Sequence, residues 1–94
     1  MSPIIWFGQY KNKYYDYDSI KIPFLVYDPL NTVDPKVRLF KDGIEIESSP
    51  WTITSFEEFT EWEIVDADIN KYNYYSISCQ NDSNIEEREI VFEV

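Results

Sequence analysis

The stretch that decides the fold is "YNYYSISCQND", residues 72–82, in which apolar and polar side chains alternate. A period of two residues is typical of a β-strand that has one face in a core and one face in water. Tyr75, Ile77 and Cys79 are therefore expected to face inward, while Ser76 and Ser78 face the solvent. The segment predicts a strand of a domain built around one hydrophobic core.

Strand signals of the same kind recur along the chain. The run at residues 19–28 alternates, and Pro23 within it favours an edge position or a bulge because proline has no N–H to donate. Asp42-Gly43 lies between two alternating runs and predicts a β-hairpin, from which Ile44 and Ile46 return. Residues 55–59, "SFEEF", are the one place where a short helical turn is plausible. The strand-like segments are residues 4–10, 19–28, 36–48, 51–56, 59–66, 72–80 and 87–94.

These signals predict an all-β fold, an antiparallel immunoglobulin-like β-sandwich of about seven strands. The length of 94 residues fits one domain, residues 1–94, in which residues 1–18 form an N-terminal strand and an aromatic segment and residues 19–94 form the sandwich core. Apolar residues make up 44% of the chain, which is enough for such a core. The predicted core contains Phe24, Val26, Leu39, Trp62, Ile64, Tyr75, Ile77, Cys79, Ile90 and Phe92.

A specific spacing, "I-x-x-x-x-x-Y-x-I-x-C", connects Ile69, Tyr75, Ile77 and Cys79. It resembles the corresponding stretch of fibronectin type III and related immunoglobulin-like domains, in which the tyrosine hydroxyl bonds to nearby backbone. With "KIPFLVYDP", "VRLFKDGIEI" and "TEWEI", the resemblance covers residues 20–94 and extends to immunoglobulin-like modules of bacteriophage structural proteins and bacterial surface proteins. It implies a role in virion or surface architecture and adhesion, and it transfers no catalytic residues.

Charge and cysteine content exclude several classes of function. The net charge of −10 disfavours nucleic acid and anionic membranes as partners, and it suits a basic protein partner. One cysteine cannot form an internal disulfide, and Cys79 is expected to be a small buried hydrophobe. No apolar run has the length of a membrane helix.

Catalytic and metal chemistry have little support in the sequence. There is no histidine, so no Ser-His or Cys-His relay can form. The pairs Asp66 with Asp68, and Glu57 with Glu58, are glycosidase-like only in composition. Asp66, Asp68 and Asn70 offer oxygen ligands for calcium, but the spacing departs from that of an EF-hand, and a solvated loop with Asp68 capping a turn is favoured. We expect no enzyme activity and no cofactor, and the sequence leaves calcium binding undecided.

The sharper lead is the aromatic segment "YKNKYYDYDS", residues 10–19. Its tyrosines, Tyr10, Tyr14, Tyr15 and Tyr17, lie among lysines and aspartates. Clustered tyrosines are typical of recognition surfaces, and their rings can also stack on sugars. The alternative is that they cover one open end of the sandwich or pair across strands.

Carboxylates on the same face of a strand suggest a second class of function. Glu61 with Glu63, and Glu87 with Glu89, could form acidic rows that imitate a nucleic-acid backbone. Carboxylates also protect sheet edges from aggregation. The predicted function is thus a non-catalytic structural or adhesive module on a virion or cell surface, with other virion or surface proteins or host glycans as partners. The alternative is a small acidic inhibitor of a nucleic-acid-handling enzyme in the host cytoplasm.

Overall fold

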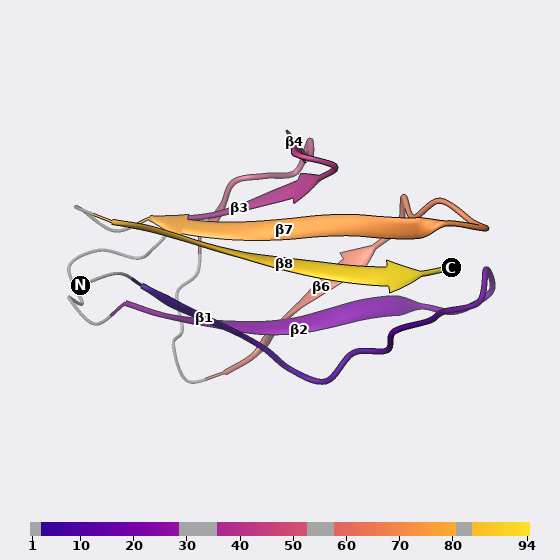
Figure 1. The fold of residues 1–94 in the computed structure, drawn as a ribbon. Helices are drawn as coiled ribbons and strands as arrows, with labels where there is room; N and C mark the ends of the chain where they lie inside the picture. Colours follow the sequence, from indigo (N-terminus) through magenta and orange to yellow (C-terminus); the bar gives the residue numbers. More distant parts are fainter. Residues whose placement is uncertain (1–2, 29–35, 53–57, 81–83) are drawn as a thin grey trace.

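The computed structural model describes residues 3–28, 36–52, 58–80 and 84–94. These ranges form two antiparallel β-sheets and contain eight strands, so the all-β prediction is confirmed (Figure 1). The three-stranded sheet has the order β1-β2-β6, from β1 (Ile4–Phe7), β2 (Ile20–Tyr27) and β6 (Thr60–Ile64). The five-stranded sheet has the order β4-β3-β7-β8, with β5 also paired to β3. It consists of β3 (Lys36–Lys41), β4 (Ile44–Glu45), β5 (Trp51–Thr52), β7 (Tyr72–Gln80) and β8 (Ile85–Glu93).

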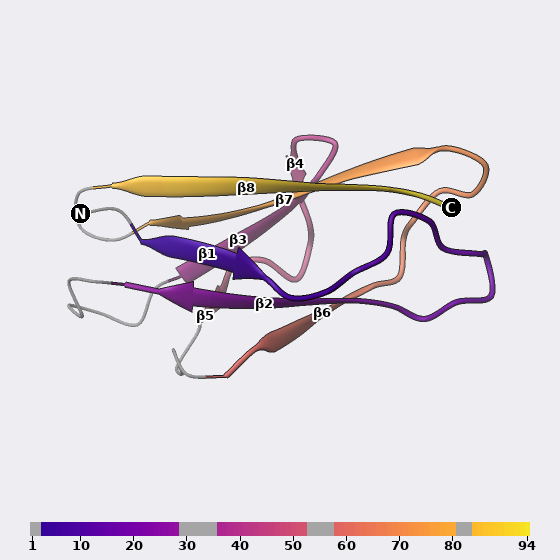
Figure 2. The ribbon, with the colours of Figure 1, turned by 60° about the horizontal axis from the view of Figure 1, so that its bottom comes forward.

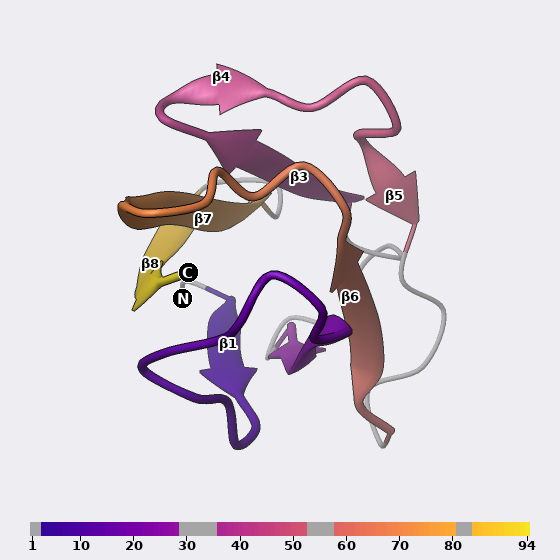
Figure 3. The ribbon, with the colours of Figure 1, turned by 90° about the vertical axis from the view of Figure 1, so that its right-hand side faces the viewer.

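The core lies between the two sheets, with β3 and β7 on one side and β1 and β2 on the other (Figure 3). All ten residues predicted for it are buried, because the inward positions follow the alternation in each strand. Further buried apolar side chains come from the same alternation in β1, β2 and β3 and from the segment after β1: Ile5, Tyr14, Ile20, Ile22 and Val37.

Cys79 is buried and carries a free thiol, as predicted. Burial, followed by the negative charge of Asp28, raises the pKa of the Cys79 thiol to about 11. The thiol therefore stays neutral near neutral pH, and it packs as a small apolar side chain.

The hairpin at Asp42-Gly43 is also confirmed. Asp42 and Gly43 have φ angles of 51° and 80°, the pair of positive values that a tight type I′ turn requires. The returning strand is shorter than predicted, since β4 holds only Ile44–Glu45; Ile44 is exposed, and Ile46 packs partly against the core. The rest of the strand expected at residues 51–56 and most of the helical turn expected at residues 55–59 lie outside the described residues, as do residues 29–35 and 81–83.

The prediction for Pro23 is wrong, because β2 is the central strand of its sheet, between β1 and β6. The Pro23 carbonyl accepts a hydrogen bond from the Gly8 N–H at 2.7 Å, directly after β1 ends at Phe7. Two residues that form a hydrogen-bonded pair in an antiparallel ladder exchange two N–H···O bonds. Pro23 has no N–H, so it can only accept the bond from Gly8. The bond that is missing falls at the end of the ladder between β1 and β2. A central strand tolerates proline at this position because little pairing is lost.

Gly8 directly follows β1, which is an edge strand of the three-stranded sheet, and lies against the Pro23 ring. β1 also approaches β8 of the other sheet (Figure 2). A Cβ at Gly8 would lie 2.6 Å from Cγ of Pro23, which is closer than carbon atoms can approach. Gly8→Ala should therefore lower the free energy of unfolding by about 1–3 kcal/mol, measured by urea denaturation. Gln9→Ala, at the exposed neighbouring position, should change it by less than about 0.5 kcal/mol. An equal effect of the two variants would contradict this contact.

Candidate functional site

The segment after β1 attaches to the end of β8 as a short parallel extension. The Tyr14 N–H donates to the Glu93 carbonyl at 2.8 Å, and the Glu93 N–H donates to the Asn12 carbonyl at 2.9 Å. Lys13 is the residue bridged to Glu93 between these two bonds. This pairing fixes the aromatic segment against the five-stranded sheet and determines which of its rings face the core.

The four tyrosines of the segment divide into two pairs. Tyr14 is buried, packs edge-on against Phe92 at 5.2 Å between ring centroids, and its hydroxyl accepts a hydrogen bond from the Lys11 N–H. Tyr10 is half-buried and packs edge-on against Phe7 at 6.2 Å. These two rings serve the core, as the alternative interpretation expected. Tyr10 and Tyr14 therefore contribute little to the exposed aromatic surface that was predicted.

Tyr15 and Tyr17 stay in solvent, with 56% and 80% of their surface exposed. Their rings stack at 5.7 Å with an angle of 5° between the planes. The turn that presents them is closed at both ends, because the Tyr15 N–H donates to the Asp18 carboxylate at 2.7 Å and the Asp18 N–H donates to the Tyr15 carbonyl at 2.9 Å. The structure therefore brings together two of the four predicted site tyrosines as a supported aromatic pair.

The loop between β6 and β7 lies next to this turn and is held by the buried side chain of Asn73. Asn73 accepts a hydrogen bond from the Asp68 N–H at 2.8 Å and donates to the carbonyls of Asp68 (2.9 Å) and Lys71 (3.2 Å). Asn70 adopts a positive φ of 62°, and its N–H donates to the Val94 carbonyl. The cap of this turn is thus Asn73, and the prediction that Asp68 caps it is wrong.

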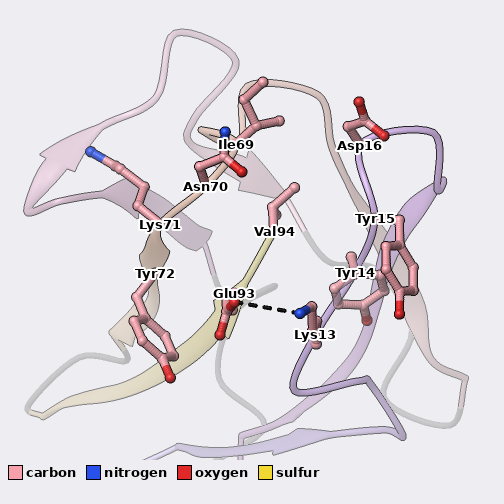
Figure 4. A pocket seen from close by; sticks show the side chains of 10 residues that line it. All are labelled: Lys13, Tyr14, Tyr15, Asp16, Ile69, Asn70, Lys71, Tyr72, Glu93 and Val94. Atoms are coloured by element: carbon pink, nitrogen blue, oxygen red, sulfur yellow. Dashed lines mark ion pairs between the residues drawn. The ribbon is translucent and has the colours of Figure 1, made fainter.

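The turn and the loop enclose a pocket of about 590 Å³. Tyr15 stands on one side and Tyr72, from the start of β7, on the other, with Lys13 and Glu93 between them (Figure 4). The nitrogen of Lys13 lies 3.6 Å from a carboxylate oxygen of Glu93. The full lining consists of Lys13, Tyr14, Tyr15, Asp16, Ile69, Asn70, Lys71, Tyr72, Glu93 and Val94.

Of the residues that line this pocket, only Tyr14 and Tyr15 were predicted as binding residues; Tyr72 and Ile69 are two that were not. Tyr72 is 59% exposed, and its place in the alternation marks it only as outward-facing. Ile69 was expected to belong to the pattern of the Tyr75 strand, but it is 57% exposed and lines the pocket. The reason is local, since the turn that Asn73 holds directs the Ile69 side chain away from the core.

The Tyr75 hydroxyl also differs from the expected arrangement. It donates to a carboxylate oxygen of Asp66 at 2.9 Å, whereas the resemblance implied a bond to backbone. Lys41 completes this cluster: its ammonium donates to the Asp66 carbonyl, lies 3.3 Å from the Asp68 carboxylate and stands over the Tyr75 ring. The cluster ties the loop that forms one pocket wall to the core.

Asp66 and Asp68, two of the carboxylates considered for calcium or catalysis, take part in this cluster. Asp66 binds the Tyr75 hydroxyl, and Asp68 is ion-paired with Lys41 and, at 3.5 Å, with Lys71. Within the described ranges, no group of three or more histidine, cysteine, aspartate or glutamate side chains could hold a metal ion. Glu57, the other candidate, lies outside those ranges.

Lys41, through a hydrogen bond and its charge, holds the pKa of Asp68 below its ordinary value of 3.8, and Lys71 adds to this effect. A carboxylate whose pKa is lowered by folding stabilises the fold above its unfolded-state pKa, and this contribution is lost as the pH falls through the folded-state value. The free energy of unfolding should therefore decrease between about pH 5 and about pH 2. Urea denaturation across this range should show a smaller decrease for Asp68→Asn; an identical decrease would exclude Asp68 as a source.

The acidic rows do not form one surface. Glu61 and Glu63 lie on β6 in the three-stranded sheet, and Glu87 and Glu89 lie on β8 in the other sheet. Glu61 is also within 4.0 Å of Lys21 on the neighbouring strand. A nucleic-acid mimic needs its charge on one face, so this distribution does not favour the inhibitor alternative.

A second exposed surface is apolar and lies on the outer face of β1 and β2. Ile4 pairs with Tyr27, and Trp6 pairs with Leu25. The exposed fractions of Ile4, Trp6 and Tyr27 are 39%, 50% and 44%. Apolar side chains grouped in this way are typical of contact surfaces between proteins.

Comparisons with family models, with curated proteins and with solved structures give no match to this chain. In the part of the chain that the structure describes, no helix has the length and apolar character needed to span a membrane.

Proposed function

We propose that this chain is a non-catalytic module with a structural or adhesive role in a phage virion or bacterial surface protein, and that it acts through protein or glycan contacts. The observation that carries the proposal is the pocket at the Tyr15 end of the sandwich. Exposed tyrosine rings beside a few polar side chains, on a rigid β-scaffold, are typical of recognition sites. The pocket lining contains no histidine and no thiol that would suggest catalysis.

The order of the strands supports the immunoglobulin-like part of the proposal. In the seven-stranded immunoglobulin-like sandwich the first, second, fourth and fifth strands share one sheet, and the third, sixth and seventh share the other. Among the described residues, the sheet of β1, β2 and β6 has no counterpart of the fourth strand. If β4 is treated as an addition beside β3 and β5 is set aside as a short pairing, the order β1-β2-β6 and the order β3-β7-β8 follow the rest of this rule. The Tyr75 strand then occupies the penultimate position, which in immunoglobulin-like domains is the position of the strand that carries the corner tyrosine.

The test is binding of the labelled chain to bacterial cells and to their extracted surface polysaccharide. Saturable binding is expected, and Tyr15→Ala should weaken it about tenfold, since one aromatic contact contributes about 1.5 kcal/mol. Tyr74→Ala is the matched control, because Tyr74 is 47% exposed but does not line the pocket. Tyr74→Ala should bind like the parent chain.

Two results would contradict the proposal. If Tyr15→Ala leaves saturable binding unchanged, the pocket is not the binding site. Absence of binding to cells and polysaccharide, together with tight and strongly salt-dependent binding to a basic nucleic-acid-handling enzyme, would favour the inhibitor alternative.

A further inference from the structure

We propose that the pocket between Tyr15 and Tyr72 binds a neutral carbohydrate and discriminates against acidic ones. The inference rests on the proposed function and deepens it, because it names the chemical class of the ligand. Three properties of the site carry it: the placement of the two exposed rings, the balance of charge in the lining, and the acidic hollow that adjoins it.

The two rings come from different parts of the chain and lie on opposite sides of the pocket (Figure 4). Tyr15 is supported by its stack on Tyr17 and by the turn that Asp18 closes. Tyr72 is supported by its pairing with Glu93 across the β7–β8 ladder. A sugar ring has an apolar face of C–H groups that packs on an aromatic ring, so each of these exposed tyrosines is suited to contact a saccharide unit.

Polar side chains between the rings supply partners for hydroxyl groups. Lys13 offers donors, Glu93 and Asp16 offer acceptors, and Asn70 offers both. The volume of about 590 Å³ lies in the range of small-ligand sites and accommodates a sugar unit with part of its neighbour. These groups match a polyhydroxylated ligand better than an apolar one.

The charges of the lining decide between neutral and acidic sugars. Two lysines, Lys13 and Lys71, balance two carboxylates, Asp16 and Glu93. The lysines are moreover engaged in ion pairs, Lys13 with Glu93 at 3.6 Å and Lys71 with Asp68 at 3.5 Å. An anionic ligand would have to compete with these paired carboxylates for the lysines and would also approach a chain of net charge −10, and both effects oppose its binding.

A second hollow of about 290 Å³ adjoins the first and shares Tyr15, Asp16, Ile69 and Val94 with it. Its described lining includes Asp16, Asp18 and Glu63 and no lysine or arginine. A glycan chain that continues from the pocket into this hollow meets only carboxylates as charged groups. The extension should therefore strengthen binding of neutral oligosaccharides and further oppose acidic ones.

The experiment is calorimetric titration of the whole chain with neutral trisaccharides (cellotriose, mannotriose and chitotriose) and with the anionic trigalacturonate. At least one neutral trisaccharide should bind with an affinity that changes little with salt, and trigalacturonate should bind at least about tenfold more weakly. Tyr72→Ala should weaken neutral binding about tenfold, and Tyr72→Phe, which keeps the ring, should weaken it less than Tyr72→Ala does. Tyr74→Ala, outside the pocket, should bind like the parent. The NMR spectrum of each variant checks that it is folded.

Three outcomes would overturn the inference: preference for trigalacturonate, neutral binding that survives both Tyr72→Ala and Tyr15→Ala, or no binding of any neutral trisaccharide. The cell and polysaccharide assay separates these failures from a failure of the proposed function. Binding there that depends on Tyr15, without binding of the neutral trisaccharides, would retain the adhesive module and reject the neutral sugar. Loss of binding in both assays would reject both.

Discussion

Replacing Tyr75 with alanine is expected to lower the free energy of unfolding by about 4 kcal/mol, the largest effect of any variant considered for this protein. The Tyr75 side chain is 1% exposed. Its ring stacks on Phe92 at 5.6 Å and meets Trp62 edge-on at 5.5 Å. Alanine would leave a cavity between the two sheets, and a cavity of this size in a close-packed core cannot fully collapse.

The hydroxyl of Tyr75 contributes separately through its bond to Asp66. Burial, followed by the hydrogen bond to Asp66, raises the pKa of Tyr75 well above its usual range, so the hydroxyl remains a donor at every ordinary pH. Tyr75→Phe keeps the ring and removes this donor, and it should lower the free energy of unfolding by about 1–3 kcal/mol. Urea denaturation of Tyr75→Ala and Tyr75→Phe measures the contributions of the whole side chain and of the hydroxyl alone. Equal losses for phenylalanine and alanine would show that the ring packing contributes nothing beyond the hydroxyl.

Replacing Asn73 with alanine is expected to lower the free energy of unfolding by about 3 kcal/mol, since it leaves buried backbone groups of the loop without partners. The same side chain holds the turn of residues 68–71, which carries Ile69, Asn70 and Lys71 into the pocket lining. The variant should therefore also weaken ligand binding, although Tyr15 and Tyr72 are untouched.

Urea denaturation and titration with bacterial polysaccharide test the two effects of Asn73→Ala. The matched control is Gln80→Ala, an exposed amide on the same strand, which should change the free energy of unfolding by less than about 0.5 kcal/mol and leave binding intact. Unchanged binding by a folded but destabilised Asn73→Ala chain would contradict the role of this loop as a pocket wall.

The alternation in the sequence predicted most of the core because it encodes the buried face of a strand directly. In β7 and β8, for example, the inward positions of Ile77, Cys79, Ile90 and Phe92 follow from position alone. Pro23 was misplaced because its position in the sheet depends on where the neighbouring ladder ends, and that is decided by β1 and Gly8. The pattern of a single strand contains no information on its partners.

The site was predicted in part. Tyrosine clustering indicated the aromatic segment, but it did not separate the buried Tyr14 from the exposed Tyr15, because that division follows from the parallel pairing of Lys13 with Glu93. Tyr72 was missed because its role requires the start of β7 to lie beside the turn at Tyr15, a neighbourhood that only the folded chain creates. The Asn73 cap was missed for a similar reason, since a polar residue at an inward position gives no sign of its backbone partners.

The central claim is that the chain binds its ligand in the pocket between Tyr15 and Tyr72. The most direct measurement is an NMR titration of the isotope-labelled chain with extracted bacterial surface polysaccharide. Amide shifts are expected to concentrate at residues 13–16 and 69–72 and at Glu93, which line the pocket. Shifts concentrated on the outer face of β1 and β2, at Ile4, Trp6 and Tyr27, with the pocket unchanged, would contradict it.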